Sequence, residues 1–266
     1  MKSRSKTSSS HSNIIIDSRR IINDSTPFGV KEAYRSLYTN IMYLPFESKC
    51  KKIVFTSAFP GEGKTSVSIN MAYTIAATSP ETKILLIDAD MRSPRVAKLL
   101  GIDTRDHHGL SEYLAGIDEE PTITESIYPN LSIITSGAEN TNTPALLSAS
   151  KMRRLVEYCD ANYDYVIIDT PPINIVTDAV FLSEHVDGYV IVTRADYSDV
   201  HSVADAISTL EKVEGHILGI VLSSLDSKKM ARYGYGRYGK YGRYGGKYGR
   251  YGQYGRYGSS KYTGTK

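Results

Sequence analysis

One short stretch of the chain carries residue types that could hold a phosphate group. It reads Ser57-Ala58-Phe59-Pro60-Gly61-Glu62-Gly63-Lys64-Thr65. A glycine-bearing turn that ends in Gly-Lys-Thr points backbone N–H groups at an anion, and a side chain at Gly61 or Gly63 would hold the backbone away from it. Ala58 stands where the first glycine of the pattern is usual, and it is nearly as small. The stretch predicts a nucleoside triphosphate site, with Lys64 at the β- and γ-phosphates and the Thr65 hydroxyl on Mg²⁺.

The neighbours of this loop agree with that interpretation. An apolar run, 52–56, precedes it and indicates a strand, whereas 66–72 has the pattern of a helix. The start of a helix adds about half a positive charge to the site. A chance Gly-Lys-Thr in a turn would not need this strand–helix context. The predicted nucleotide-binding residues are Ala58, Phe59, Pro60, Gly61, Glu62, Gly63, Lys64, Thr65 and Ser66.

Carboxylates follow two further apolar runs. Asp88 and Asp90 come directly after the run 83–87, and Asp169 ends the run 163–168. Ligands of open α/β sheets bind at the carboxyl ends of the strands, so the first pair is a candidate for a metal or catalytic role. Asp169 fits the Walker B position, where a carboxylate holds Mg²⁺ or its water. The plainer alternatives are a turn for Asp-x-Asp and a strand-end aspartate for Asp169.

The remaining pattern alternates between strand-like and helical segments. Further apolar runs and helical segments follow each other along the chain. The strands are expected at 131–135, 188–192 and 216–222, and the helices at 31–43, 94–100, 109–116, 144–158 and 200–213. Such alternation is typical of a parallel sheet covered by helices on both faces. We therefore expect an α/β fold with a doubly wound, mostly parallel sheet of the P-loop NTPase type.

Charge is distributed unevenly along the 266 residues. The net charge is +3, but the part from Ser227 onward has eleven basic residues and no acidic one, so residues 1–226 carry −8. This balance argues against a nucleic-acid-binding body. Two cysteines, Cys50 and Cys159, offer no disulfide framework, which fits a reducing compartment. No apolar run reaches the ~18–20 residues of a membrane span, and no signal-peptide core is visible, so we expect any work at a membrane to depend on a partner.

The C-terminal segment is built from tyrosine, glycine and basic residues. Its tyrosines are Tyr233, Tyr235, Tyr238, Tyr241, Tyr244, Tyr248, Tyr251, Tyr254, Tyr257 and Tyr262. Because such a composition cannot bury a core, we expect a disordered tail that reaches roughly 30–35 Å. The expected domains are a flexible segment 1–26, a P-loop domain 27–226 and the tail 227–266. Composition leaves three functions open for this tail: stacking on single-stranded nucleic acid, self-association, or acceptance of phosphate.

Several motifs together resemble one family. They are Glu32-Ala33-Tyr34-Arg35-Ser36-Leu37, the loop 57–65, Asp88-Ala89-Asp90-Met91-Arg92, Thr135-Ser136-Gly137, Asp169-Thr170-Pro171-Pro172 and the tyrosine cluster. In these the chain resembles the bacterial tyrosine kinases that regulate capsular and exopolysaccharide synthesis, in the form whose cytoplasmic kinase is a separate polypeptide. The resemblance implies an ATP- and Mg²⁺-dependent protein-tyrosine kinase that phosphorylates its own tail tyrosines.

The same resemblance implies roles and partners. The catalytic residues would be Lys64, Asp88 and Asp90, and the metal would be held by Thr65, Asp88, Asp90 and Asp169, with Asp88 accepting the tyrosine proton or helping to hold the metal. The implied partners are a transmembrane activator of the polysaccharide co-polymerase type, a cognate phosphotyrosine phosphatase, and sugar-precursor enzymes as substrates. A ring-like homo-oligomer that acts in trans is implied, as is a cytoplasmic location at the inner face of the membrane through the activator. Nucleic acid is not among the implied partners.

The chain departs from the family in three places. The usual Glu-x-x-Arg-x-x-Arg of the first helix has Tyr38 at its third position, the segment 142–147 reads Asn-Thr-Pro-Ala-Leu-Leu, and Ser223-Ser224 follows the last strand where many relatives have Asn. A partitioning ATPase of the MinD/ParA type is the nearest alternative. Those proteins have a lysine where this chain has Phe59, and that difference favours the kinase. A nucleotide-gated adaptor with a nucleic-acid-binding tail is the alternative without enzymatic activity.

Overall fold

The computed structural model describes residues 20–105 and 108–225. Its centre is a seven-stranded sheet with the order β3-β4-β2-β5-β1-β6-β7. The short β3 is antiparallel to β4, and every other neighbouring pair is parallel. The prediction of a mostly parallel, doubly wound sheet is confirmed. The strands are β1 (Lys51–Ser57), β2 (Ile84–Asp88), β3 (Thr124–Glu125), β4 (Leu131–Ile134), β5 (Tyr165–Asp169), β6 (Gly188–Arg194) and β7 (Ile217–Ser223).

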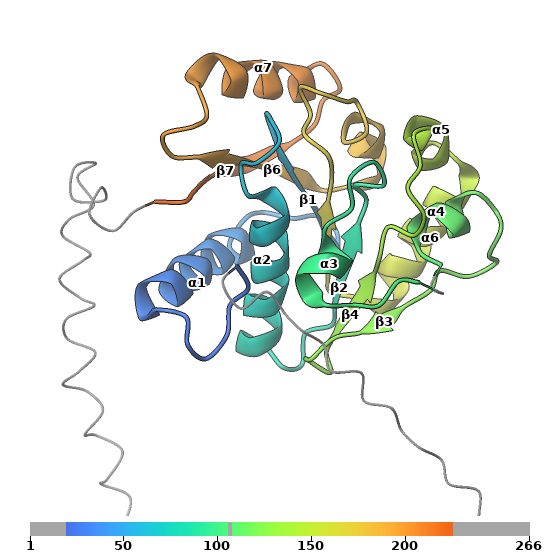
Figure 1. The fold of residues 1–266 in the computed structure, drawn as a ribbon, viewed down its shortest axis with the longest axis horizontal. Helices are drawn as coiled ribbons and strands as arrows, with labels where there is room; N and C mark the ends of the chain where they lie inside the picture. The colour runs from blue at the N-terminus through green and yellow to red at the C-terminus, as the bar shows by residue number, and fades with distance from the viewer. Residues whose placement is uncertain (1–19, 106–107, 226–266) are drawn as a thin grey trace, which may run out of the picture. The chain divides into compact units, whose positions relative to one another are not determined.

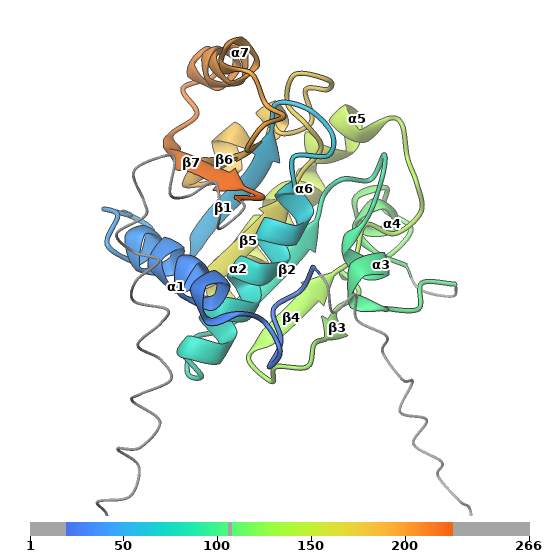
Figure 2. The ribbon, with the colours of Figure 1, turned by 60° about the vertical axis from the view of Figure 1, so that its left-hand side comes forward.

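Helices cover both faces of this sheet (Figures 1 and 2). One face packs against α1 (Phe28–Met42), α2 (Lys64–Thr78) and α3 (Val96–Leu100), which share one apolar cluster with alternate strand residues. Figure 1 shows α2 between α1 and α3 on this side. The other face packs against α4 (Leu110–Leu114), α5 (Thr143–Leu147), α6 (Ser150–Asn162), the 3₁₀ helix η1 (Val180–His185) and α7 (Val200–Glu211).

The central strands are buried on both faces, as expected for parallel strands between two helix layers. Every residue of β2 and β5 is buried, and β1 is buried from Lys52 onward. At the edge, β7 alternates between half-buried and exposed residues, with Ile220 and Leu222 about half exposed. The strands that end at the predicted carboxylates therefore lie in the most deeply buried part of the sheet.

Some local predictions were wrong. The single helix expected over 144–158 is two helices, α5 and α6, because Ala149 between them has an extended backbone (φ −70°, ψ 154°). The first helix, whose amphipathic pattern covers 31–43, spans Phe28–Met42 with Pro27 at its N-cap position. Neither β3 nor η1 was anticipated.

Residues 20–26 pack on the domain, although we expected the flexible segment to extend to residue 26. Ile21 is almost completely buried, and the Ile22 N–H donates a hydrogen bond of 2.8 Å to Asn70 Oδ1 on α2. The tail and its ten tyrosines lie outside the described residues, as does His107. His108 is exposed, and its Nδ1 lies 2.9 Å from Asp118 Oδ2. In the described part of the chain no helix is long and apolar enough to cross a membrane.

Candidate functional site

The predicted site residues come from three neighbouring strands. β2, β5 and β1 are adjacent and parallel, so their carboxyl ends meet at one edge of the sheet. Asp88 at the end of β2 lies directly opposite Asp169 at the end of β5, and Asp169 is in register with Phe55 of β1. The phosphate-binding loop starts two residues later, after β1. Topology thus brings together segments that are more than 100 residues apart in the chain.

The loop 58–63 has the backbone of a phosphate cradle. Gly61 (φ 85°) and Gly63 (φ 94°) both adopt positive φ, which glycine tolerates and most residues do not. Gly63 immediately precedes α2, so the free N–H groups of the helix start face the loop. A Cβ added at Gly63 would lie 3.3 Å from Ser223 Oγ, so the loop is also closely packed on its outer side.

Glu62 braces the loop from inside. Its side chain is buried, Oε2 accepts a hydrogen bond of 2.8 Å from the Phe59 N–H, and Oε1 accepts one from the Ser198 hydroxyl. The Ser223 hydroxyl donates a 2.6 Å bond to the Glu62 carbonyl. The Glu62 side chain is therefore occupied by the protein, although we predicted contact with nucleotide for every residue of the loop. Its backbone remains part of the cradle.

Lys64 lies among the predicted carboxylates. Its Nζ donates a 2.8 Å hydrogen bond to Asp90 Oδ2 and lies 3.8 Å from Asp169 Oδ2. Burial opposes the charged form of this lysine, but Asp169 and Asp90 outweigh that effect and raise its pKa. Lys64 is thus a buried cation whose position depends on the same carboxylates that are expected to hold a metal.

Asp88 is completely buried and tied to its own loop. Its Oδ1 accepts a hydrogen bond of 3.1 Å from the Asp90 N–H, and its Oδ2 accepts bonds from the N–H groups of Arg95 and Val96. Burial, reinforced by the charge of Asp169, raises the pKa of Asp88 to about 7. A carboxylate with that pKa exchanges protons readily near neutral pH.

Asp169 has one satisfied and one open oxygen. Oδ1 accepts a 3.2 Å bond from the Ser68 hydroxyl, whereas Oδ2 is buried without a hydrogen-bond donor. Burial raises the pKa of Asp169, and the charge of Lys64 partly offsets that increase. Lys64 Nζ lies 3.8 Å from Oδ2, too far for a hydrogen bond, and a buried carboxylate oxygen without one is costly. A cation that binds at this oxygen would remove that cost.

These residues fit Mg²⁺. The ion prefers oxygen ligands and usually takes only one or two carboxylates, with substrate phosphates and water completing its shell. Thr65, Asp90 and Asp169 offer such oxygens around Lys64, and Asp169 Oδ2 lacks a donor. Within the described residues no group of three or more His, Cys, Asp or Glu forms a ready-made metal cage.

A second group of residues holds the phosphate-binding loop from outside. The Tyr197 hydroxyl donates a 3.1 Å bond to the Pro60 carbonyl, and Arg194 Nη1 donates a 3.2 Å bond to the Gly61 carbonyl. The Arg194 guanidinium also lies over the Tyr197 ring, 5.5 Å from its centre. No pattern in the sequence predicted these contacts, because the residues lie more than 130 positions after the loop and match no motif.

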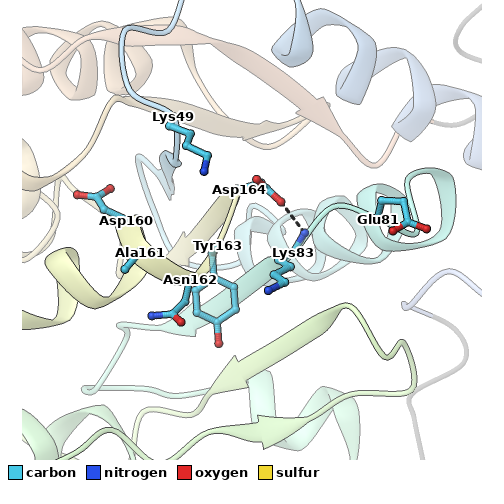
Figure 3. A pocket seen from close by; sticks show the side chains of 8 residues that line it. All are labelled: Lys49, Glu81, Lys83, Asp160, Ala161, Asn162, Tyr163 and Asp164. Atoms are coloured by element: carbon cyan, nitrogen blue, oxygen red, sulfur yellow. Dashed lines mark hydrogen bonds between the residues drawn. The ribbon is translucent and has the colours of Figure 1, made fainter.

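A polar hollow lies at the other end of the strands, opposite the carboxyl ends that carry the predicted site (Figure 3). It is formed where β1, β2 and β5 begin, and its lining includes Lys49, Lys83 and Asp164. The Lys83 backbone N–H donates a 2.9 Å bond to Asp164 Oδ2 across it. None of the predicted site residues lines this hollow, whose lining contains both lysines and carboxylates.

Comparisons with known proteins agree with this geometry. The family described as "AAA domain" matches residues 50–220. Tyrosine-protein kinase YwqD of Bacillus subtilis is 34% identical over 205 residues, which are 77% of this chain and 85% of YwqD. The chain belongs to the bacterial tyrosine-protein kinases. The kinase is also similar to tyrosine-protein kinase etk of Escherichia coli, at 34% identity over 77% of this chain but only 28% of etk.

Solved structures give the same result. The kinase domain of Escherichia coli ETK superposes with a TM-score of 0.68 at 34% identity, covering 73% of this kinase and 75% of that chain. The MinD cell division protein of Aquifex aeolicus superposes with a TM-score of 0.55 at 22% identity, covering 70% and 73% of the two chains. At that identity the second likeness shows a shared fold alone. The tyrosine-kinase prediction is confirmed, and the kinase has a nucleotide-binding P-loop fold.

Proposed function

We propose that this kinase uses ATP and Mg²⁺ to phosphorylate the tyrosines of its own C-terminal tail. One observation carries the proposal: Lys64, Asp90 and Asp169 converge at the edge of the sheet where the phosphate-binding loop begins. The chain also places ten tyrosines in a basic, glycine-rich segment directly after the domain. A phosphoryl donor site and a dense set of acceptors thus belong to one polypeptide. The proposed domains are the segment 1–26, of which residues 20–26 pack on the kinase domain, then the kinase domain 27–226 and the acceptor tail 227–266.

The loop residues 58–66 hold the phosphates of ATP. Backbone N–H groups of the loop and the start of α2 bind the phosphate oxygens, and Lys64 adds its charge at the β- and γ-phosphates. Thr65, Asp90 and Asp169 would hold Mg²⁺, with Asp88 beside them. When bound, the ion neutralises charge that develops on the phosphates during transfer.

Asp88 is the group that receives the proton of the attacking tyrosine. In the transfer a bond forms between the tyrosine oxygen and the γ-phosphorus, the bond from that phosphorus to the β–γ bridging oxygen breaks, and ADP leaves. The hydroxyl proton moves to the Asp88 carboxylate. A pKa of about 7 leaves much of this carboxylate ionised at neutral pH, as a proton acceptor requires.

The kinase domain of one subunit reaches the tail of another within a ring-like assembly. The acceptors are the ten tail tyrosines Tyr233, Tyr235, Tyr238, Tyr241, Tyr244, Tyr248, Tyr251, Tyr254, Tyr257 and Tyr262. Each phosphate adds about −1.5 to −2 charges, so modification of all ten reverses the sign of a tail that starts at +11. A strongly basic segment therefore becomes strongly acidic. That reversal is a physical basis for assembly when the tail is unmodified and dissociation after modification.

Partners follow from the family. The kinase spans about a quarter of etk, so in that relative the matching part is joined to a much longer chain. We propose that here a separate membrane protein of the polysaccharide co-polymerase type supplies the activating segment and holds the kinase at the inner face of the membrane. The output is control of capsular or exopolysaccharide synthesis, with a phosphotyrosine phosphatase as antagonist and sugar-precursor enzymes as further substrates.

A mixing experiment tests the proposal. One protein carries Lys64→Met and an intact tail, and the other carries an intact site with all ten tail tyrosines changed to phenylalanine. Incubated together with labelled ATP and Mg²⁺, with and without a fragment of the candidate activator, the Lys64→Met chain should become labelled and neither should be labelled alone. Release of free phosphate without any labelled protein would instead indicate an ATPase of the MinD type. Nucleotide binding without turnover, joined to salt-dependent RNA binding by the tail, would indicate an adaptor.

A further inference from the structure

Asp178 is a buried carboxylate that the mechanism above does not use. It lies in the loop between β5 and η1 and has no solvent exposure. Arg92 donates two hydrogen bonds to it, from Nε to Oδ2 at 3.0 Å and from Nη2 to Oδ1 at 3.3 Å. The hydroxyl of Thr143, also completely buried, donates a third bond of 2.6 Å to Oδ2. Two side chains thus meet at one buried anion.

These three residues come from three different segments. Arg92 lies two residues after Asp90, in the loop between β2 and α3, and Thr143 begins α5. Asp178 follows Asp169 by nine residues, in the loop that leaves β5. Side-by-side hydrogen bonds between a guanidinium and a carboxylate fix both distance and orientation, unlike a single contact. The Asp178 carboxylate therefore links the loop that follows β5 to the loop that follows β2.

Beyond Asp88, the loop that carries Asp90 is anchored by the buried side chain of Met91 and by backbone hydrogen bonds. The Ala89 N–H donates to the Asp169 carbonyl at 2.8 Å, and the Met91 carbonyl accepts a bond of 2.9 Å from the Asn140 N–H. The Arg92 side chain connects this loop to the segment after β5, because it binds Asp178. Asp90 itself makes the closest contact to Lys64. A shift of this loop would move Asp90 relative to Lys64 without moving the phosphate-binding loop.

We propose that Asp178 is a positioning residue, which holds through Arg92 the loop bearing Asp90 in the arrangement that phosphoryl transfer requires. Thr143 orients the Asp178 carboxylate for this task. The inference rests on the proposed function of the site. It concerns turnover rather than nucleotide affinity, because the network touches neither the loop 58–63 nor Lys64 directly.

The test uses full-length chains and compares Asp178→Asn, Arg92→Gln and the double variant. Asp178→Asn should lower the turnover number for tail phosphorylation by about 10- to 100-fold, as loss of a group that aligns reacting atoms does, with ADP affinity within about threefold of wild type. Because the residues act as one unit, the double variant should be no slower than the slower single variant. Asp187→Asn is the matched control, since Asp187 accepts from the Lys52 N–H at 2.6 Å at the far edge of the sheet.

A residue that only stabilises the fold and a residue that positions the Asp90 loop should give different results in this experiment. Asp187→Asn should lower the melting temperature while leaving turnover within about twofold of wild type. Thr143→Val and Thr143→Ser add a second, milder pair, in which only the serine variant keeps the hydroxyl and should keep the activity. This pair also serves if Asp178→Asn does not fold.

Three results would overturn the inference: wild-type turnover in Asp178→Asn, equal turnover in the two Thr143 variants, or an equal loss in Asp187→Asn. If wild type itself transfers no phosphate to its tail, the proposed function fails first. Wild-type activity that persists in Asp178→Asn removes the positioning role alone.

Discussion

Lys64 Nζ lies 2.8 Å from Asp90 Oδ2, so the predicted phosphate-binding cation and a predicted metal ligand form one buried ion pair. Asp169 Oδ2 is only 3.8 Å from the same nitrogen. In this arrangement the lysine supplies the positive charge that balances the carboxylates. In the proposed function, Mg²⁺ held by these carboxylates would supply part of that charge balance, and Lys64 would add its charge at the phosphates. The two partners are held in place by the ends of β2 and β5 and the start of α2.

Replacement of Lys64 by methionine tests that pairing. Lys64→Met should abolish tail phosphorylation, with a loss of about 100-fold or more, because no other residue of the loop carries a positive charge to the phosphates. Removing one partner of a buried ion pair should also cost about 3 kcal/mol in the free energy of unfolding at pH 8. Phosphate incorporation and chemical denaturation measure the two effects. Lys83→Met, at an exposed lysine on the opposite edge of the sheet, should change neither.

The raised pKa of Asp88 predicts how stability depends on pH in the metal-free protein. Its folded pKa of about 7 lies above the unfolded value near 3.8, so the folded state binds the extra proton between these values. The contribution of this group to stability is therefore fully present below about pH 4 and is lost as the pH rises through 7. Denaturation of wild type and Asp88→Asn from pH 5 to 8 should show a decline in wild type that is reduced in the variant. Parallel pH profiles would contradict the assignment.

The contacts of Glu62 predict that its replacement weakens nucleotide affinity while the domain stays folded. Glu62→Ala removes the acceptor of the Phe59 N–H and of the Ser198 hydroxyl, so the phosphate-binding loop loses its internal brace. We expect ADP to bind about tenfold more weakly to the variant. Its loop would have to become ordered when ADP binds, and this ordering reduces the net free energy of binding. Calorimetric titration measures this change. Glu81→Ala, at an exposed carboxylate away from the loop, is the control, and equal affinity in both variants would exclude the bracing role.

Tyr38 shows why the usual arginine of the family motif is absent from α1. Its side chain is buried, its hydroxyl lies 3.1 Å from Ser79 Oγ, and its ring packs edge-on against Tyr165. Tyr38→Phe should destabilise the domain by about 1 kcal/mol, and Tyr38→Arg by several times that amount, because an unpaired cation would be buried. Tyr43→Phe, at a largely exposed tyrosine one residue after the helix, should be neutral by the same denaturation measurement. A stable Tyr38→Arg variant would mean that the side chain can leave the core.

The site was predictable where it depends on strand ends. Asp88, Asp90 and Asp169 follow apolar runs, and parallel strands place their carboxyl ends together, so the carboxylates had to converge. Glu32 and Arg35 of the family motif 32–37 form a 2.5 Å ion pair within α1, at an i, i+3 spacing.

Other features depend on contacts that no local pattern encodes. The break between α5 and α6 lies at Ala149, a residue with high helix propensity, and β3 has only two residues. Arg194, Tyr197 and Ser198 reach the phosphate-binding loop only after the sheet has formed. The role proposed for Asp178 likewise depends on its hydrogen bond from Arg92, which lies 86 positions earlier in the chain. Such tertiary partners cannot be inferred from spacing in one sequence.

The central claim is that this site transfers phosphate to the tail, and residue-resolved mass spectrometry of the segment 233–262 tests it most directly. Full-length protein would be incubated with ATP and Mg²⁺, with the activator fragment present, and compared with Lys64→Met under the same conditions. We predict phosphotyrosine at several of the ten tail positions in wild type and none in the variant. An unmodified tail in wild-type protein that demonstrably binds the nucleotide would contradict the account.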